Sequence, residues 1–204
     1  MTEELLDGRR ERGRRTRESI LATAVDLASV EGLEGLTIGR LATELGMSKS
    51  GLFAHFGSKE ELQLATIEAA REIFVRTVVQ PALAADRGLP RLAALLEAKL
   101  EYLREGVFRG GCFFDAARME YDGRRPGPVR DAILEQFADW SKLVADCVRA
   151  AQREGHLDPA VDAEQVAFEL DAIPTAANMR FQIDRDEAAF DLARRAIAAR
   201  LAAL

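Results

Sequence analysis

A compact polar cluster stands at residues 48–59, in a chain otherwise dominated by Ala, Leu, Arg and Glu at helical spacing. Lys49 and Ser50 can donate hydrogen bonds to base edges or phosphates, and Ser50 can also accept one. Gly51 removes side-chain bulk where another surface would have to approach closely. Base-edge contacts select a nucleic-acid sequence and phosphate contacts fix the register, so this cluster is a candidate for nucleic-acid recognition.

Two short helices must hold this cluster. Thr37 and Ser48 are good N-cap residues, and Gly46 between them permits the left-handed turn that ends a helix. Leu52 and Phe56 lie one turn apart and bury the opposite face of the second helix. The pattern predicts a helix, a short turn and a helix whose outer face is small and polar, which suits the major groove. Any capped corner of two helices would share this spacing, so the spacing alone leaves a purely structural role open.

Charge is spread unevenly along the 204 residues, whose net charge is -6. Residues 8–59 carry nine Arg or Lys against six Asp or Glu, and six of these bases lie between Arg9 and Arg17. A basic segment on an acidic body is typical of a head that binds a polyanion. The Arg-rich segment is either an arm that reaches phosphates or a minor groove, or a tail that only aids solubility.

The remaining chain indicates an all-α protein. Hydrophobic residues make up 48% of it and aromatic residues only 6%, and the apolar residues recur every three or four positions rather than every second one. Short breaks rich in Gly, Pro or Asp separate about nine expected helices. No apolar run approaches the ~20 residues that a membrane span needs, and the N-terminus lacks the apolar core of a signal peptide. These features predict a soluble, cytoplasmic protein without membrane contact.

Residues 16–65 resemble the N-terminal domain of TetR-family transcriptional regulators. The resemblance rests on the order of "TRESILATA", "GLEGLTIGRLA" and "GMSKSGLFAHFGSKEEL", and it covers about a quarter of the chain. The later stretch "GGCFFDAARMEYDGRRPGPVRDAI" resembles the C-terminal domain of one TetR subgroup. The resemblance implies a basic flexible arm at 1–15, a three-helix helix-turn-helix DNA-binding domain at 16–58, and a helical ligand-binding and dimerisation domain at 59–204.

The function implied is that of a ligand-responsive regulator. It would bind a palindromic double-stranded DNA operator as a homodimer, repress transcription, and be released by a small-molecule inducer. Alternatives are a transcriptional activator, or a dimeric helical protein that binds small molecules without regulated DNA release. The sequence contains no nucleophile motif, P-loop or dinucleotide fingerprint, so we expect no enzyme activity and no cofactor. The two His and two Cys lack metal-ligand spacing, so we expect no metal site.

The resemblance also assigns roles to individual residues. Ser48, Lys49, Ser50 and Gly51 fall at the base-facing start of the recognition helix. The positions that usually meet phosphates are Thr37, Phe53, His55 and Lys59. Many family members have Tyr at position 53, so Phe lacks the hydroxyl that would bind a phosphate there. Arg40, in the preceding helix, is a further phosphate candidate.

Two regions of the body receive functional predictions. The last two helices, expected at 162–182 and 186–203, have small Ala-rich faces and are predicted to form the dimer interface. An apolar ligand pocket would be lined by aromatic and other large apolar residues. The candidates are Phe74, Phe113, Phe114, Met119, Trp140 and Phe168. Cys112 and Cys147 are either redox-sensitive or buried and unreactive.

Overall fold

The computed structural model describes residues 3–204, with side chains from residue 13 onward. If the run from α4 through the π-helical turn η1 to α5 is counted once, nine helices and no strand make up the described residues, which confirms the all-α prediction. In chain order the elements are α1 (Glu3–Gly35), α2 (Ile38–Leu45), α3 (Lys49–Phe56), α4 (Lys59–Phe74), η1 (Val75–Val79), α5 (Gln80–Ala82), α6 (Leu89–Arg104), α7 (Phe113–Tyr121), α8 (Pro128–Arg153), α9 (Ala163–Asp184) and α10 (Ala188–Ala202).

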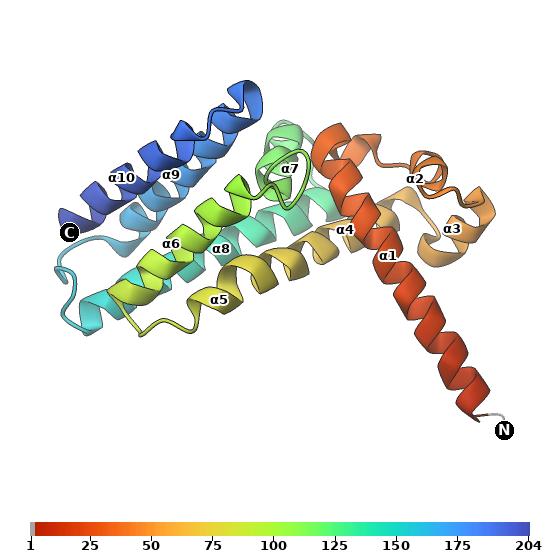
Figure 1. Ribbon diagram of the computed structural model, residues 1–204, viewed down its shortest axis with the longest axis horizontal. Coiled ribbons are helices and arrows are strands. Elements are labelled where there is room, and N and C mark those ends of the chain that lie inside the picture. The colour runs from red at the N-terminus through yellow and green to blue at the C-terminus, as the bar shows by residue number, and fades with distance from the viewer. Residues whose placement is uncertain (1–2) are drawn as a thin grey trace.

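The first helix is longer than expected. Its backbone is helical from Glu3, so residues 3–15 are helical turns rather than the flexible arm predicted from the sequence. The physical reason lies in composition, because this stretch is rich in Arg, Glu and Leu, which lose little freedom in a helix, and contains no Pro. In Figure 1 this part of α1 projects away from the rest of the molecule.

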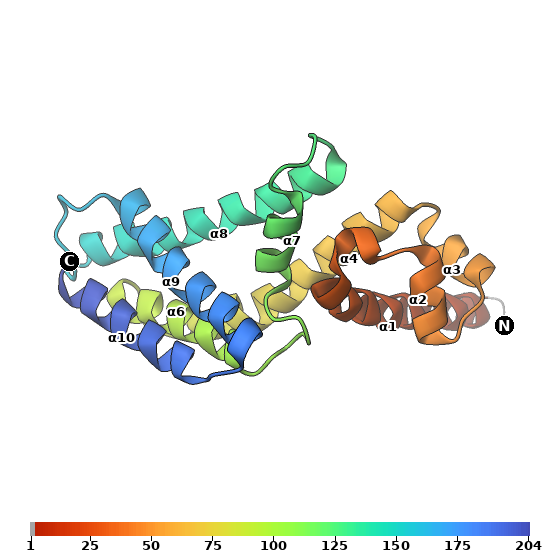
Figure 2. The same ribbon diagram turned by 90° about the horizontal axis from the view of Figure 1, so that it is seen from above.

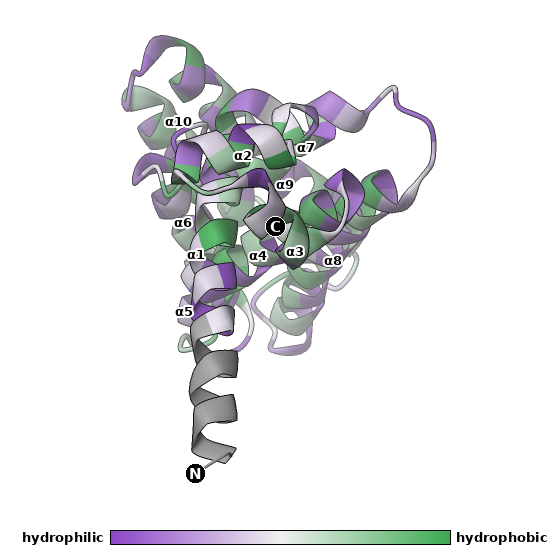
Figure 3. Ribbon diagram, turned by 90° about the vertical axis from the view of Figure 1, so that its right-hand side faces the viewer, coloured by the Kyte–Doolittle hydropathy of each residue, from purple (hydrophilic) through white to green (hydrophobic). Residues whose placement is uncertain are grey.

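A small head is formed by α1, α2 and α3, seen end-on in Figure 3. Leu41 from α2 and both Leu52 and Phe56 from α3 are at most 2% exposed, and they pack with Ile20 and Ala24 of α1. The spacing of these apolar residues at three and four positions gives each short helix one buried face. The opposite faces of α2 and α3 are therefore left to solvent.

The body contains α6 to α10, and α4 runs from the head into it (Figures 1 and 2). The helices α9 and α10 lie side by side along the body, with the C-terminus at the end farthest from the head, and α8 packs along α9. Leu96, Val144, Val148 and Leu170 are at most 1% exposed and belong to one core. Within residues 3–204, no helix combines the length and the apolar character that crossing a membrane requires.

The junction of head and body is centred on a break in α1. Gly32 has φ 78° and ψ 162°, a backbone region that side chains rarely adopt, so the helical hydrogen bonds are interrupted there. The backbone N–H groups of Leu33 and Glu34 donate instead to the carboxylate of Glu120 in α7, at 2.7 and 2.9 Å. A carboxylate at the start of a helical turn satisfies otherwise unpaired donors and complements their partial positive charge. Glu120 therefore fixes the end of α1 against α7.

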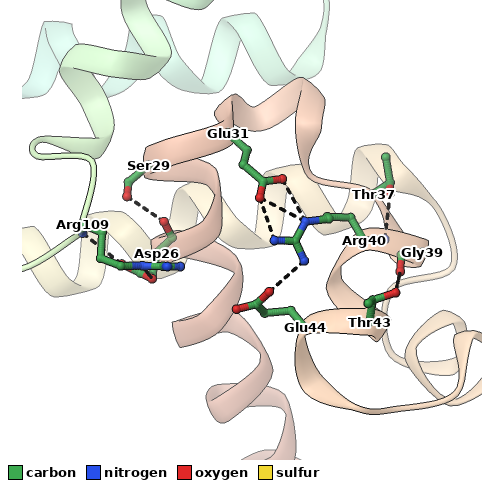
Figure 4. Close-up of polar contacts among 9 residues, drawn as sticks. All are labelled: Asp26, Ser29, Glu31, Thr37, Gly39, Arg40, Thr43, Glu44 and Arg109. Atoms are coloured by element: carbon green, nitrogen blue, oxygen red, sulfur yellow. Dashed lines mark hydrogen bonds and ion pairs between the residues drawn. The ribbon is translucent and has the colours of Figure 1, made fainter.

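A second contact at the junction involves the loop between α6 and α7 (Figure 4). Arg109 donates from its backbone N and its Nε to the carboxylate of Asp26, at 3.0 and 2.5 Å. The N–H of Gly110 donates to Ser29 Oγ at 3.1 Å. A Cβ on Gly110 would lie 1.9 Å from the carbonyl oxygen of Ser29. The two backbones meet so closely that only glycine fits.

Glu34 ties three elements together beside this contact. Lys59 Nζ at the start of α4 donates to Glu34 Oε2 at 2.8 Å and to its carbonyl oxygen at 2.9 Å. The Tyr121 hydroxyl donates to Glu34 Oε1 at 2.8 Å, and Arg124 lies 3.4 Å from the same oxygen. The hydrogen bonds from Lys59 and Tyr121 lower the pKa of Glu34 to about 2. Glu34 is therefore an ionised link between α1, α4 and α7.

Replacement of Gly110 by alanine should strongly destabilise the fold. The added Cβ cannot be accommodated without moving backbone, so we expect Gly110→Ala to lower the free energy of unfolding by about 1–3 kcal/mol or more. Urea unfolding followed by far-UV circular dichroism measures this change. Gly123→Ala is the matched control, because nothing lies within 4 Å of its added Cβ. Equal stability of the two variants would contradict the close approach.

The link at Glu34 predicts a pH dependence. Its folded-state pKa, about 2, lies below the ordinary value of 4.5, so ionised Glu34 stabilises the fold above pH 4.5 and this contribution fades as the pH falls toward 2. The stability advantage of the wild type over Glu34→Gln should therefore shrink from pH 7 to pH 3. The pair is partly exposed, so we expect about 1 kcal/mol or less. Urea unfolding measures this advantage as a difference in midpoint between the two proteins. A difference that stays constant from pH 7 to pH 3 would refute the role of ionised Glu34.

Candidate nucleic-acid interface

The helices α2 and α3 meet at a capped turn. Gly46 ends α2 with φ 63°, and its N–H donates to the carbonyl oxygens of Ala42 and Thr43. Ser48 Oγ then accepts from the N–H of Gly51 at 3.1 Å and begins α3. These contacts match the two short capped helices predicted from the sequence. They hold the start of α3 at the solvent side of the head, where Figure 3 places it in front of the body.

The residues predicted to face bases lie together at this start. Ser48, Lys49 and Ser50 are exposed, and the hydroxyls of Ser48 and Ser50 are 3.3 Å apart. A Cβ on Gly51 would lie 3.1 Å from Ser48 Oγ, so the lack of a side chain there leaves room for the cap. The first turn of α3 thus presents two hydroxyls and one ammonium group without a large side chain.

Lys49 reaches back over the start of α2. A Cβ on Gly39 would lie 3.3 Å from Lys49 Cε and 3.9 Å from Thr37 Oγ1, so Lys49 and Thr37 are neighbours across Gly39. Thr37 is exposed and caps α2, its Oγ1 accepting from the N–H of Arg40 at 3.0 Å. The helix N-terminus and the ammonium group together favour an anion such as phosphate. The sequence analysis did not select Gly39, whose missing side chain leaves space for Lys49 beside Thr37. The signal in the sequence was a glycine two residues after the N-cap Thr37.

Two further predicted phosphate contacts, Phe53 and His55, differ in environment. Phe53 is 56% exposed, one turn after Lys49 on the same side of α3, so its ring does not serve the core. It cannot donate a hydrogen bond but can contact apolar parts of DNA such as a thymine methyl group. His55 is half-buried, and its ring lies beside that of Phe56 with centroids 6.2 Å apart.

Lys59 and Arg40 are already engaged within the protein. The ammonium group of Lys59 is bound to Glu34 at the junction. The guanidinium of Arg40 is bound by both carboxylate oxygens of Glu31 and by Glu44, at 2.7 to 3.0 Å (Figure 4). These carboxylates raise the pKa of Arg40 further, chiefly through the hydrogen bond with Glu31. Both cations hold helices together within the protein, and their contact with phosphate stays a prediction.

The Arg-rich segment also has a structural part. Arg17 Nη1 donates to the carbonyl oxygen of His55 at 2.6 Å, and its guanidinium lies 4.5 Å from the centre of the Phe56 ring. Arg17 therefore fastens the C-terminal end of α3 to α1, a role that the sequence analysis did not assign. The side chains of Arg9, Arg10 and Arg12 lie outside the described residues.

The body has a tightly packed aromatic centre. Phe74 makes edge-to-face contacts with Tyr102, Phe114 and Trp140, at centroid distances of 5.2 to 6.3 Å. Phe74, Phe114 and Trp140 line a cavity of only about 30 Å³, which is little more than the space of one water molecule. Phe113 is 1% exposed and packs on Phe114 as core.

The other two ligand candidates lie elsewhere. Met119, which is 60% exposed, lines a larger groove of about 300 Å³ between α7 and α9. Phe168 is 70% exposed on α9 and lies outside the core of the chain, so its role in a pocket stays a prediction. Its helix turns this position outward, while Val166, Ala167 and Leu170 fill the core.

Both cysteines are buried. Cys112 is 2% exposed and Cys147 is 8% exposed. Burial raises the pKa of Cys112 to about 12 and also raises that of Cys147. Because the thiolate is the reactive form, these environments favour the unreactive alternative over redox sensing.

The outer face of α9 and α10 carries an apolar groove of about 300 Å³. Five alanines, an isoleucine, a leucine and an arginine line it: Ala176, Ala177, Ala189, Ala193, Ala196, Ile173, Leu192 and Arg180. Exposed Phe168, Met179 and Ile183 extend the apolar surface along α9. A monomeric protein rarely leaves such a surface open to water, and small residues allow close approach of another helix.

Two family descriptions match the chain. Residues 20–66 match "Bacterial regulatory proteins, tetR family", and residues 88–197 match "Tetracyclin repressor-like, C-terminal domain". The second match alone covers more than half of the chain, and it spans α6 to most of α10.

Known proteins agree with these matches. The HTH-type transcriptional regulator TcmR of Streptomyces glaucescens is 32% identical over 98 residues, 48% of this chain and 42% of that protein. The class C tetracycline repressor protein of Escherichia coli is 43% identical over 53 residues, 26% of this chain and 24% of that protein. The matched part is therefore less than half the length of these curated relatives.

A solved structure covers nearly the whole fold. A TetR transcriptional regulator from Chloroflexus aurantiacus superposes with a TM-score of 0.85 at 25% identity, covering 93% of this chain and 95% of the other. The capped α2–α3 unit, the helical body and the two family matches lead to one conclusion. The chain belongs to the TetR family, and it is a DNA-binding transcriptional regulator.

Proposed function

We propose that this regulator is a repressor that binds a palindromic operator as a homodimer and leaves it when a small molecule occupies the body. The observation that carries the proposal is that α7 contributes to both the groove of the body and the junction with the head. Asp115 and Met119 of α7 line the groove, and Glu120 and Tyr121 of the same helix bind the end of α1.

DNA recognition would be centred on the first turn of α3. Lys49 and Ser50 offer the donors for base edges, and the N-terminus of α2 at Thr37 would bind a phosphate. A single short helix reads only a few base pairs. Two copies related by a two-fold axis would read half-sites one helical turn, about 34–36 Å, or a multiple of it apart, which is why the operator would be palindromic.

Dimerisation would use the apolar face of α9 and α10. The helices α9 and α10 run along the body and take no part in the head in Figures 1 and 2, so pairing there would leave both heads open to DNA. The rotation of one body against the other would set the distance between the two recognition helices.

Induction would act through α7. A ligand that binds better when α7 is shifted favours the conformer in which the end of α1 is shifted as well. Glu120 and Tyr121 of α7 bind the end of α1 through three hydrogen bonds, so the head would follow α7 rather than swing freely. The shift is limited by the difference in ligand affinity between the two conformers.

Removal of the Lys49 ammonium group should weaken operator binding. We expect Lys49→Ala to cost about 1–3 kcal/mol of binding free energy and to reduce the preference for the operator over random DNA. Fluorescence anisotropy with a fragment from the protein's own promoter region, at moderate salt, measures both quantities.

The matched control for this experiment is Lys142→Ala. Lys142 lies on α8 in the body, and its side chain is 73% exposed. Loss of the same size in both variants would mean that general charge, and not Lys49, sets the affinity. The absence of any preference of the wild-type protein for its promoter fragment would overturn the proposed function itself.

A charge on the α9–α10 face should prevent dimerisation. Leu192 is 46% exposed in the chain by itself, so Leu192→Arg leaves the fold intact but would bury an unpaired charge in a dimer. Light scattering after size exclusion should show a dimer for the wild type and a monomer for the variant. Leu83→Arg is the control, because Leu83 is 52% exposed at the end of α5. A dimer that survives Leu192→Arg and dissociates with Leu83→Arg would place the interface elsewhere.

A further inference from the structure

The groove between α7 and α9 has a polar floor whose charges are not balanced. Asp115 is only 7% exposed, and its one hydrogen bond from another side chain comes from Asn178 Nδ2 at 3.0 Å. No Lys, Arg or His nitrogen of the described residues lies within 4.0 Å of its carboxylate. A buried carboxylate is costly unless it is paired and hydrogen-bonded, so this arrangement is unusual for a purely structural residue.

Arg118 lines the groove and Lys99 lies near it, but both are directed at other groups. Lys99 is 3% exposed and binds Asp171 Oδ1 at 2.7 Å, which also accepts from Trp140 Nε1 at 2.8 Å. Arg118 stacks on the Phe137 ring at 4.5 Å and lies 3.8 Å from the other oxygen of Asp171. Asp171 is thus fully compensated, whereas Asp115 is not.

A second observation independently indicates a ligand. Asn178 is 4% exposed and lines the same groove, and its Oδ1 has no hydrogen-bond partner. The opposite amide orientation would set that oxygen against the Asp115 carboxylate, so the unpaired group is the acceptor and not the NH₂. Thr175 Oγ1, also in the groove, lacks a partner as well. The floor therefore presents a carboxylate without a cationic partner and a carbonyl oxygen without a donor.

The rim of the groove is apolar. Met119 from α7 and Met179 and Ile183 from α9 are 60%, 48% and 85% exposed. The groove measures about 300 Å³, which is the lower end of the range for small-molecule sites. Met179 and Ile183 also border the face proposed for dimerisation, so a partner subunit would help to cover an occupant.

We propose that this groove binds a small organic ammonium ligand, with its N–H donors directed at Asp115 and Asn178 and its apolar part against Met119, Met179 and Ile183. A primary or secondary ammonium group supplies both the missing positive charge and the missing donors. An anion would meet the Asp115 carboxylate, and a neutral apolar molecule would supply neither a positive charge for Asp115 nor a donor for Asn178 Oδ1. The assignment rests on the proposed function, because it names the ligand class of the site through which α7 would be moved.

Three probes of equal chain length test the assignment on the full-length protein. Isothermal titration calorimetry at pH 7 with hexylammonium, hexanoate and 1-hexanol should show hexylammonium binding at one per chain, at least about tenfold more tightly than the other two. Asp115→Asn should abolish this preference, while Asp122→Asn, an exposed acid at the end of the same helix, should retain it. Equal or tighter binding of hexanoate or 1-hexanol, or no binding of hexylammonium at millimolar concentration, would overturn the assignment.

A second pair of variants covers the case in which Asp115→Asn fails to fold. Met119→Lys places a positive charge on the exposed rim and should weaken hexylammonium binding several-fold relative to Met119→Gln. An affinity that is the same in both rim variants would argue against a cation in the groove.

Promoter-DNA anisotropy separates this assignment from the proposed function. Binding of hexylammonium without release of DNA would uphold the ligand class and overturn ligand-induced release through this groove. Release of DNA by hexanoate or 1-hexanol, but not by hexylammonium, would uphold release and overturn the ligand class.

Discussion

The position of the head depends on the carboxylate of Glu120. Gly32 interrupts α1, and the N–H groups of Leu33 and Glu34 would have no partner if Glu120 did not accept both. Helix α4 also binds this turn, because Gln63 donates to the carbonyl oxygen of Leu33 at 2.7 Å. A backbone whose polar groups are satisfied by two other helices cannot move independently of them. A movement of α4 or α7 would therefore also move the end of α1 and the head.

The basic residues of the head divide into two groups. Arg17, Arg40 and Lys59 use their charge inside the protein, where they bind a carbonyl oxygen or carboxylates. Lys49 lies at the exposed start of α3. Three of the nine bases counted along residues 8–59 are thus bound within the protein. Binding would draw on Lys49 together with the helix N-termini capped by Thr37 and Ser48, where backbone N–H groups favour phosphate.

The aromatic residues of the body serve mainly to pack it. Edge-to-face contacts around Phe74 use the preferred geometry of aromatic pairs and leave a cavity of only about 30 Å³. The larger groove is lined instead by residues from α7 and α9 that the sequence analysis, apart from Met119, did not select. Aromatic type favours burial, because large apolar surfaces avoid water, although Phe53 and Phe168 are exposed. The residue type does not distinguish a core position from a position in a ligand pocket, since the core and the pocket are both apolar.

Local patterns in the sequence determined the helices, the caps at Thr37, Ser48 and Ser58, and the face of α3 that carries Lys49 and Ser50. These features depend on neighbours within four residues, which a linear sequence displays. The tertiary structure decided that Lys59 binds Glu34, that Phe168 faces outward, and that Asp115 and Asn178 share one groove. The partners in these contacts are up to 63 residues apart, so only the packing of α1, α7 and α9 brings them within hydrogen-bonding distance.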